Sequence, residues 1–82
     1  MEKSIGQVIK EERRSKNIKQ VDLAKKAGIS NTYLSDIENE RTEPSIKTIR
    51  NIARALNIDW TQIFLLINYV NSEQEYSKET KK

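Results

Sequence analysis

Residues 20–39 read QVDLAKKAGISNTYLSDIEN, and this stretch decides the fold. Apolar residues recur at helical spacing in its first half, which predicts a helix over residues 20–27 with one buried face. Gly28 can adopt the positive φ that ends a helix without steric cost. Ser30 is placed to cap the start of a second helix over residues 31–39. The stretch therefore predicts two short helices joined by a tight turn.

The second of these helices has one apolar and one polar face. Leu34 and Ile37 point inward with a spacing of three residues. The outward side chains that could read base edges are those of Asn31, Thr32, Tyr33, Ser35 and Asp36. Two short helices with such a polar face are typical of a helix-turn-helix that enters a DNA major groove. The alternative is an ordinary solvated face without a ligand. For Asp36, a further alternative is that its carboxylate repels phosphate and so excludes wrong registers on DNA.

Three further helices are predicted outside this stretch. Their expected ranges are 4–16, 46–56 and 60–70. Ser4, Ser45 and Asp59 are placed to cap their N-termini. Asn17 can end the first of these helices in the left-handed conformation, and Asn57 is placed as a C-terminal stop for the second. We find no strand signal, so the fold class is all-α, with five helices.

Length and composition exclude several classes of protein. The 82 residues allow one small domain, expected over residues 1–70, and the polar, aperiodic residues 71–82 are expected to be a disordered tail. The net charge of +3 is only mildly basic. The chain has no Cys and no His, which removes thiolate metal sites and the commonest general base and metal ligand, so we expect no enzyme activity and no metal site. Without a membrane-length apolar run or a signal peptide, we expect a soluble, cytoplasmic protein.

Several ordered motifs carry a family resemblance. The chain reads I-G-x-x-I-K-x-x-R over residues 5–13, K-Q-x-x-L-A-x-K-A-G-I-S over residues 19–30, and Y-L-S-x-I-E-N over residues 33–39. These motifs resemble the Xre/Cro family of phage-repressor-type helix-turn-helix regulators, over roughly residues 4–66. The resemblance implies a compact five-helix, lambda-repressor-like domain that binds double-stranded operator DNA as a dimer, without enzyme activity or cofactor.

The resemblance also implies roles for individual residues. It pairs Arg13 with Glu38 in a partly buried structural ion pair, and it gives Gln20 a phosphate contact at a helix N-terminus. The candidate phosphate ligands are Lys10, Arg14, Lys19, Gln20, Asn39, Arg41 and Lys47. For a single basic residue among them, the alternative is ordinary solvation. The family often has Gly where this chain has Asn17 and Glu40, so Glu40 places an acid in a loop that normally approaches phosphate.

The fifth predicted helix has apolar residues on two sides. One stripe contains Trp60, Ile63, Phe64 and Ile67. The other side contains Leu65, Leu66, Tyr69 and Val70. A domain this small cannot readily bury both sides, so the second is expected to form a symmetric dimer interface. The alternative is that the helix packs more deeply into its own core.

Two classes of function follow. The leading hypothesis is a sequence-specific DNA-binding transcriptional regulator, a repressor, that acts as a homodimer on a two-fold-related operator. Phage repressor, restriction–modification controller and antitoxin are all compatible subtypes, and a regulatory protein is a further candidate partner. The alternative is a protein-interaction module, such as an antitoxin or antirepressor, that uses the fifth helix and the tail. Only the first hypothesis requires binding that weakens steeply with salt.

Overall fold

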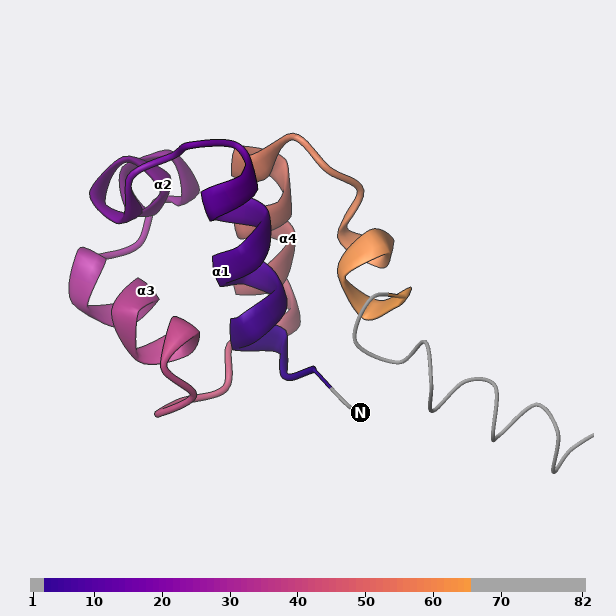
Figure 1. Cartoon of the computed structure of the whole chain (residues 1–82). Coiled ribbons are helices and arrows are strands. Elements are labelled where there is room, and N and C mark those ends of the chain that lie inside the picture. The colour runs from indigo at the N-terminus through magenta and orange to yellow at the C-terminus, as the bar shows by residue number, and fades with distance from the viewer. Residues whose placement is uncertain (1–2, 66–82) are drawn as a thin grey trace, which may run out of the picture.

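The computed structural model describes residues 3–65, and its secondary structure is entirely helical (Figure 1). The labelled helices are α1 (Ile5–Ser15), α2 (Gln20–Ala27), α3 (Asn31–Glu38) and α4 (Ile46–Leu56). Residues 60–65 form a further helical segment. The all-α class is therefore confirmed, and the helix bounds differ from the predicted ones by one residue at most where both ends are described. The continuation of the fifth helix to Val70 and the tail at 71–82 lie outside the described residues.

The helix starts follow the predicted capping residues. Ser4, Ser30 and Ser45 each accept a hydrogen bond from the backbone N–H three residues later, at 3.0–3.1 Å. Gln7 returns the bond at α1 by accepting from the backbone N–H of Ser4, which completes a capping box. Asp59 likewise accepts from the N–H of Thr61. Local polar chemistry thus sets where these helices begin.

The helix ends share one geometry. Each of α1 to α4 is followed by a residue with positive φ, and the next residue donates its N–H to the carbonyl oxygen five positions back. The positive-φ residues are Asn17, Gly28, Glu40 and Asn57. This is the Schellman arrangement, which satisfies carbonyl groups that the helix itself leaves unpaired. Asn17 and Asn57 therefore act as predicted, whereas Glu40 adopts a conformation that usually favours glycine.

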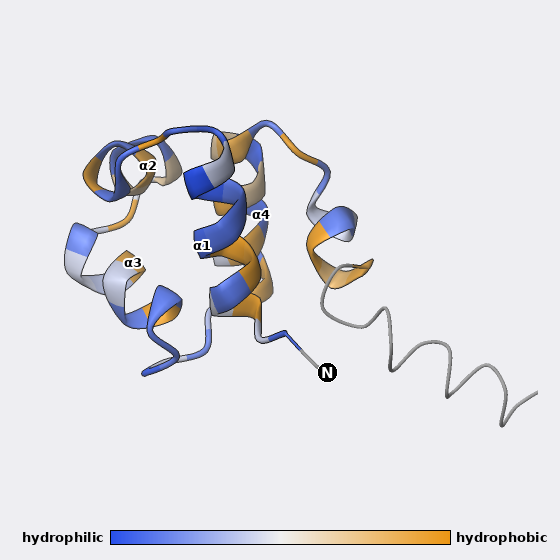
Figure 2. Cartoon of the chain, in the orientation of Figure 1, coloured by the Kyte–Doolittle hydropathy of each residue, from blue (hydrophilic) through white to orange (hydrophobic). Residues whose placement is uncertain are grey.

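A single apolar core joins the helices. Its buried members are Val8, Ile9, Leu23, Ala24, Ala27, Leu34, Ile37, Ile49, Ile52, Ala53, Leu56 and Ile63. They lie on the inward faces of the helices, and the outward faces are mainly polar (Figure 2). α2 packs chiefly against α4, and α1 against α3. In Figure 1, α2 and α3 lie on one side of α1 and α4, and residues 60–65 lie on the other.

α1 and α3 approach each other closely at Gly6. Gly6 is buried, and a Cβ atom built on it would collide with the backbone carbonyl oxygen of Ile37. A residue without a side chain is therefore needed at this point of α1. The contact fixes how far α3 stands from α1, and thus where the polar face of α3 is presented.

Candidate nucleic-acid interface

α3 presents the polar side chains that were expected to contact bases. Asn31 and Thr32 are exposed in the first turn of the helix, whereas Tyr33, Ser35 and Asp36 are half-buried. Tyr33 packs partly against the apolar core, which suits a residue at the edge of the polar face. The two residues that are freest to meet a ligand therefore lie next to each other at the N-terminal end of α3.

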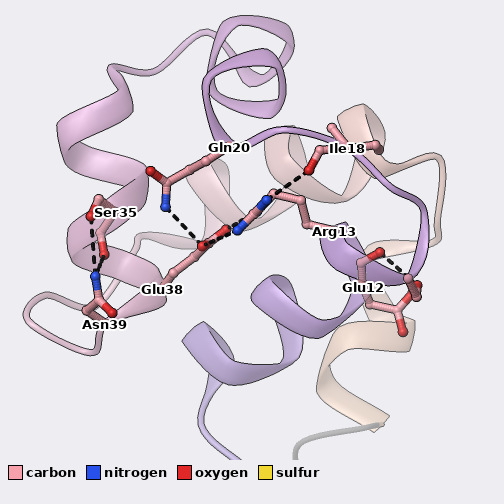
Figure 3. A network of polar contacts seen from close by, with 8 residues as sticks. Glu12, Arg13, Ile18, Gln20, Ser35, Glu38 and Asn39 are labelled. Carbon is pink, nitrogen blue, oxygen red and sulfur yellow. Dashed lines mark hydrogen bonds and ion pairs between the residues drawn. The ribbon is translucent and has the colours of Figure 1, made fainter.

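A buried ion pair anchors the C-terminal end of α3 to α1 (Figure 3). Arg13 Nε and Nη2 donate to the two carboxylate oxygens of Glu38 at 2.8 and 3.0 Å. Only 11% of the Arg13 side chain and 1% of the Glu38 side chain are exposed. The remaining guanidinium nitrogen, Nη1, donates to the carbonyl oxygen of Ile18 at 2.8 Å. The guanidinium thus links α1, the turn after it and α3, in the pairing that the family resemblance implied.

Gln20 adds α2 to the same network. Its side-chain Nε2 donates to Oε1 of Glu38 at 3.0 Å, so this carboxylate accepts hydrogen bonds from two other helices (Figure 3). The family resemblance implied a phosphate contact for Gln20, with an ordinary helix-start residue as the alternative, and neither interpretation included this contact with Glu38. No local spacing rule could have found it, because 18 positions and a turn separate Gln20 from Glu38. The network holds α1, α2 and α3 in one relative arrangement.

The residues after α3 are engaged within the protein. Arg41 Nη1 lies 3.4 Å from Oδ1 of Asp36, with 67% and 37% of the two side chains exposed. Asn39 donates from Nδ2 to the carbonyl oxygen of Ser35 at 2.9 Å and also contacts its hydroxyl. Both Arg41 and Asn39 were expected to bind phosphate. In this structure, each contacts a residue of α3 that was expected to read bases.

The four other basic residues that were expected to bind phosphate form no ion pair within the described residues. These are Lys10, Arg14, Lys19 and Lys47, of which the first is half-buried and the others are exposed. Glu40 and Glu43 are exposed in the loop between α3 and α4. Acidic groups therefore occupy the loop beside the polar face of α3.

The helical segment 60–65 contributes to the core from one side only. Ile63 is fully buried, and the ring of Phe64 meets that of Trp60 edge-on at a centroid distance of 5.5 Å. The Arg50 guanidinium lies 4.7 Å from the centroid of the Trp60 ring. Leu65 is 66% exposed, which agrees with the expected second apolar side. The other residues expected in the dimer interface, Leu66, Tyr69 and Val70, lie outside the described residues.

Within residues 3–65, no group of three or more acidic side chains, His or Cys is arranged to hold a metal ion. None of the helices in this part of the chain has the length and apolar character that a membrane span requires.

Comparison with known proteins shows what this chain is similar to. Residues 9–63 match the model of a helix-turn-helix family. The ImmF control region 10 kDa protein of Bacillus phage phi105 is 51% identical over 57 residues, which are 70% of this chain and 63% of that protein. The immunity repressor protein of the same phage is 39% identical over 80 residues, 96% of this chain and 56% of the repressor. The chain thus spans about three fifths of the length of these two relatives.

One solved structure is informative about the fold. The regulator of biofilm formation SinR, solved in complex with DNA, superimposes with a TM-score of 0.69 at 34% sequence identity. The match covers 73% of this chain and 97% of the SinR chain.

Proposed function

The chain belongs to the Xre/Cro-type helix-turn-helix family, and on that premise we propose that it is a sequence-specific transcriptional regulator that represses by occupying operator DNA. The phage immunity repressor and the DNA-bound SinR structure support this proposal. We assign the protein no catalytic activity and place it in the cytoplasm, where its operator would lie. Repression is positional, because a protein bound over a promoter blocks the polymerase.

The observation that carries the proposal is the polar face of α3 on a rigidly held helix. Asn31 and Thr32 are exposed, while Arg13, Glu38 and Gln20 fix α3 against α1 and α2. Direct readout of bases requires such a preset orientation, because misplaced donors cannot reach the base edges. The network thus acts as a support for recognition.

In the complex, α3 lies in the major groove. The amide of Asn31 pairs with the N6 and N7 atoms of an adenine, and the methyl group of Thr32 contacts a thymine methyl. Ser35 and Tyr33 contact neighbouring bases or the adjacent sugar at the edges of the helix. Each good bidentate contact of the Asn–adenine kind contributes about 1–3 kcal/mol of discrimination against a wrong base.

Phosphate contacts position the domain. Lys10, Arg14, Lys19 and Lys47 form no ion pair within residues 3–65. Their ammonium and guanidinium groups bind the DNA backbone, which releases counterions and makes affinity fall with salt. The backbone N–H groups at the start of α2 supply a further anion contact. Gln20 can contribute its second amide hydrogen there, because only one of the two is directed at Glu38.

The regulator acts as a homodimer. Leu65 is exposed directly after Phe64, which is packed against the core, so an apolar side chain is presented to solvent at this point. Two copies joined along this helix would place two α3 helices on half-sites about one DNA turn, or ~34 Å, apart. A symmetric operator is the expected target because the same surface of each subunit meets at the axis.

Selection of bound fragments from random or genomic DNA tests the proposed function. We expect enrichment of a two-fold-related sequence and binding that weakens steeply as salt rises. An absence of both enrichment and salt-dependent binding would contradict the proposal. It would instead favour a protein-interaction module.

A further inference from the structure

The end of α3 differs from the other three helix ends in one position. After α1, α2 and α4, the residue that donates its N–H five positions back is an isoleucine: Ile18, Ile29 and Ile58. All three are partly buried against the core, as is usual for a Schellman arrangement, in which an apolar contact accompanies the backbone bonds. After α3, the corresponding residue is Arg41, whose N–H bonds to the carbonyl oxygen of Asp36 at 2.8 Å.

The backbone geometry brings Arg41 and Asp36 together at this end. The Schellman arrangement places the residue after the helix beside the residue five positions earlier, and here the usual apolar pair is replaced by two opposite charges. Glu40, at a φ of 63°, makes the required left-handed turn between them. The ion pair of Asp36 and Arg41 is therefore preset by the backbone.

We propose that Asp36 determines specificity by acting through Arg41: it holds the guanidinium against α3 and so lowers the affinity for DNA of arbitrary sequence. This inference rests on the proposed function, since it concerns how α3 and its following loop meet DNA. On a mismatched sequence the carboxylate faces acceptor atoms of the bases and keeps Arg41 as its partner. Opposite a base that offers an amino group, such as cytosine N4, the carboxylate accepts from the base. Arg41 is then free to bind a phosphate.

The exposure of the pair makes such an exchange feasible. Arg41 is 67% exposed and its contact with Asp36 is 3.4 Å long, so the pair is much weaker than the buried one between Arg13 and Glu38. Exposed pairs of this kind shift an equilibrium by only about two- to fivefold. A phosphate or a base amino group can therefore compete for either partner.

A double-mutant cycle on non-specific DNA tests the inference. The probe is a fluorescently labelled duplex of random sequence, titrated by anisotropy at fixed salt with wild type, Asp36→Asn, Arg41→Ala and the double variant. Asp36→Asn removes a negative charge and should raise affinity in both backgrounds. When Arg41 is present, the gain should be about two- to fivefold larger, because Arg41 is also released. A second cycle with Arg41→Gln in place of Arg41→Ala should give the same coupling between positions 36 and 41.

Glu43→Gln is the matched control. It removes a carboxylate from the loop that carries Arg41, and Glu43 forms no ion pair within residues 3–65. The gain in affinity for random DNA from Glu43→Gln should be equal with and without Arg41. Equal gains for Asp36→Asn in the two backgrounds, at unchanged helical circular dichroism, would overturn the inference and leave simple charge repulsion. If wild type shows no salt-dependent DNA binding at all, the proposed function has failed instead.

Discussion

Replacing Glu38 with alanine should destabilise the domain more than any exposed charge substitution. Glu38 is 1% exposed and accepts three hydrogen bonds: two from Arg13 at 2.8 and 3.0 Å and one from Gln20 at 3.0 Å. Its removal leaves the guanidinium of Arg13, whose side chain is only 11% exposed, with the carbonyl of Ile18 as its remaining partner. Breaking a buried pair in this way costs about 3–5 kcal/mol.

This cost is large for so small a domain. Proteins of this size have a free energy of unfolding of about 0.05–0.15 kcal/mol per residue, or roughly 4–12 kcal/mol for the whole chain. Each kcal/mol lost shifts the midpoint of thermal unfolding by about 4–8 °C in domains of 60–100 residues. The Glu38→Ala midpoint should therefore fall by at least about 12 °C. Thermal unfolding followed by circular dichroism measures it.

Glu11→Ala provides the matched control. Glu11 also forms an ion pair, with Lys3 at 2.7 Å, but its side chain is 57% exposed. Exposed pairs contribute about 0–1 kcal/mol, so this variant should shift the midpoint by only a few degrees. Equally small shifts for Glu38→Ala and Glu11→Ala would refute the reasoning, since burial of the pair would then carry no energetic weight.

Three further substitutions test other parts of the structure. Gly6→Ala should lower the free energy of unfolding by about 1–3 kcal/mol in denaturant titrations, because the new Cβ collides with the carbonyl of Ile37; an unchanged value would contradict the close approach. Glu40→Gly should raise the free energy of unfolding by about 1 kcal/mol, because glycine relieves the left-handed strain, whereas Glu40→Gln should leave it unchanged. Equal effects of the two substitutions would contradict the strain. Leu65→Glu should convert a dimer into a monomer in sedimentation experiments, and a dimer retained by this variant would remove Leu65 from the interface.

The helix boundaries could be predicted because short-range chemistry sets them. Ser4, Ser30 and Ser45 cap through bonds to residues three positions away, and such spacing is visible in the sequence. Asn17 could be assigned to a left-handed position, and Asn57 to a helix end, because asparagine tolerates that conformation. The core followed from apolar residues at helical spacing.

Contacts between distant residues could not be derived in the same way. Arg13 and Glu38 are 25 positions apart, and their pairing was expected only from the family resemblance. The contact of Gln20 with Glu38 depends on the angle between α1, α2 and α3, which no local pattern encodes. The left-handed turn at Glu40 was not foreseen, because glutamate itself gives no signal for it, although the family often has Gly at this position.

Specific recognition of bases by α3 is the central claim, and one comparison tests it most directly. Wild type and Asn31→Ala are each used to select bound fragments from random DNA, and their affinities for the wild-type site are then measured. We predict that Asn31→Ala loses about 1–3 kcal/mol on that site, changes little on random DNA, and no longer selects one base in each half-site. Identical selected sequences for the two proteins, or equal losses on selected and random DNA, would contradict base readout by α3.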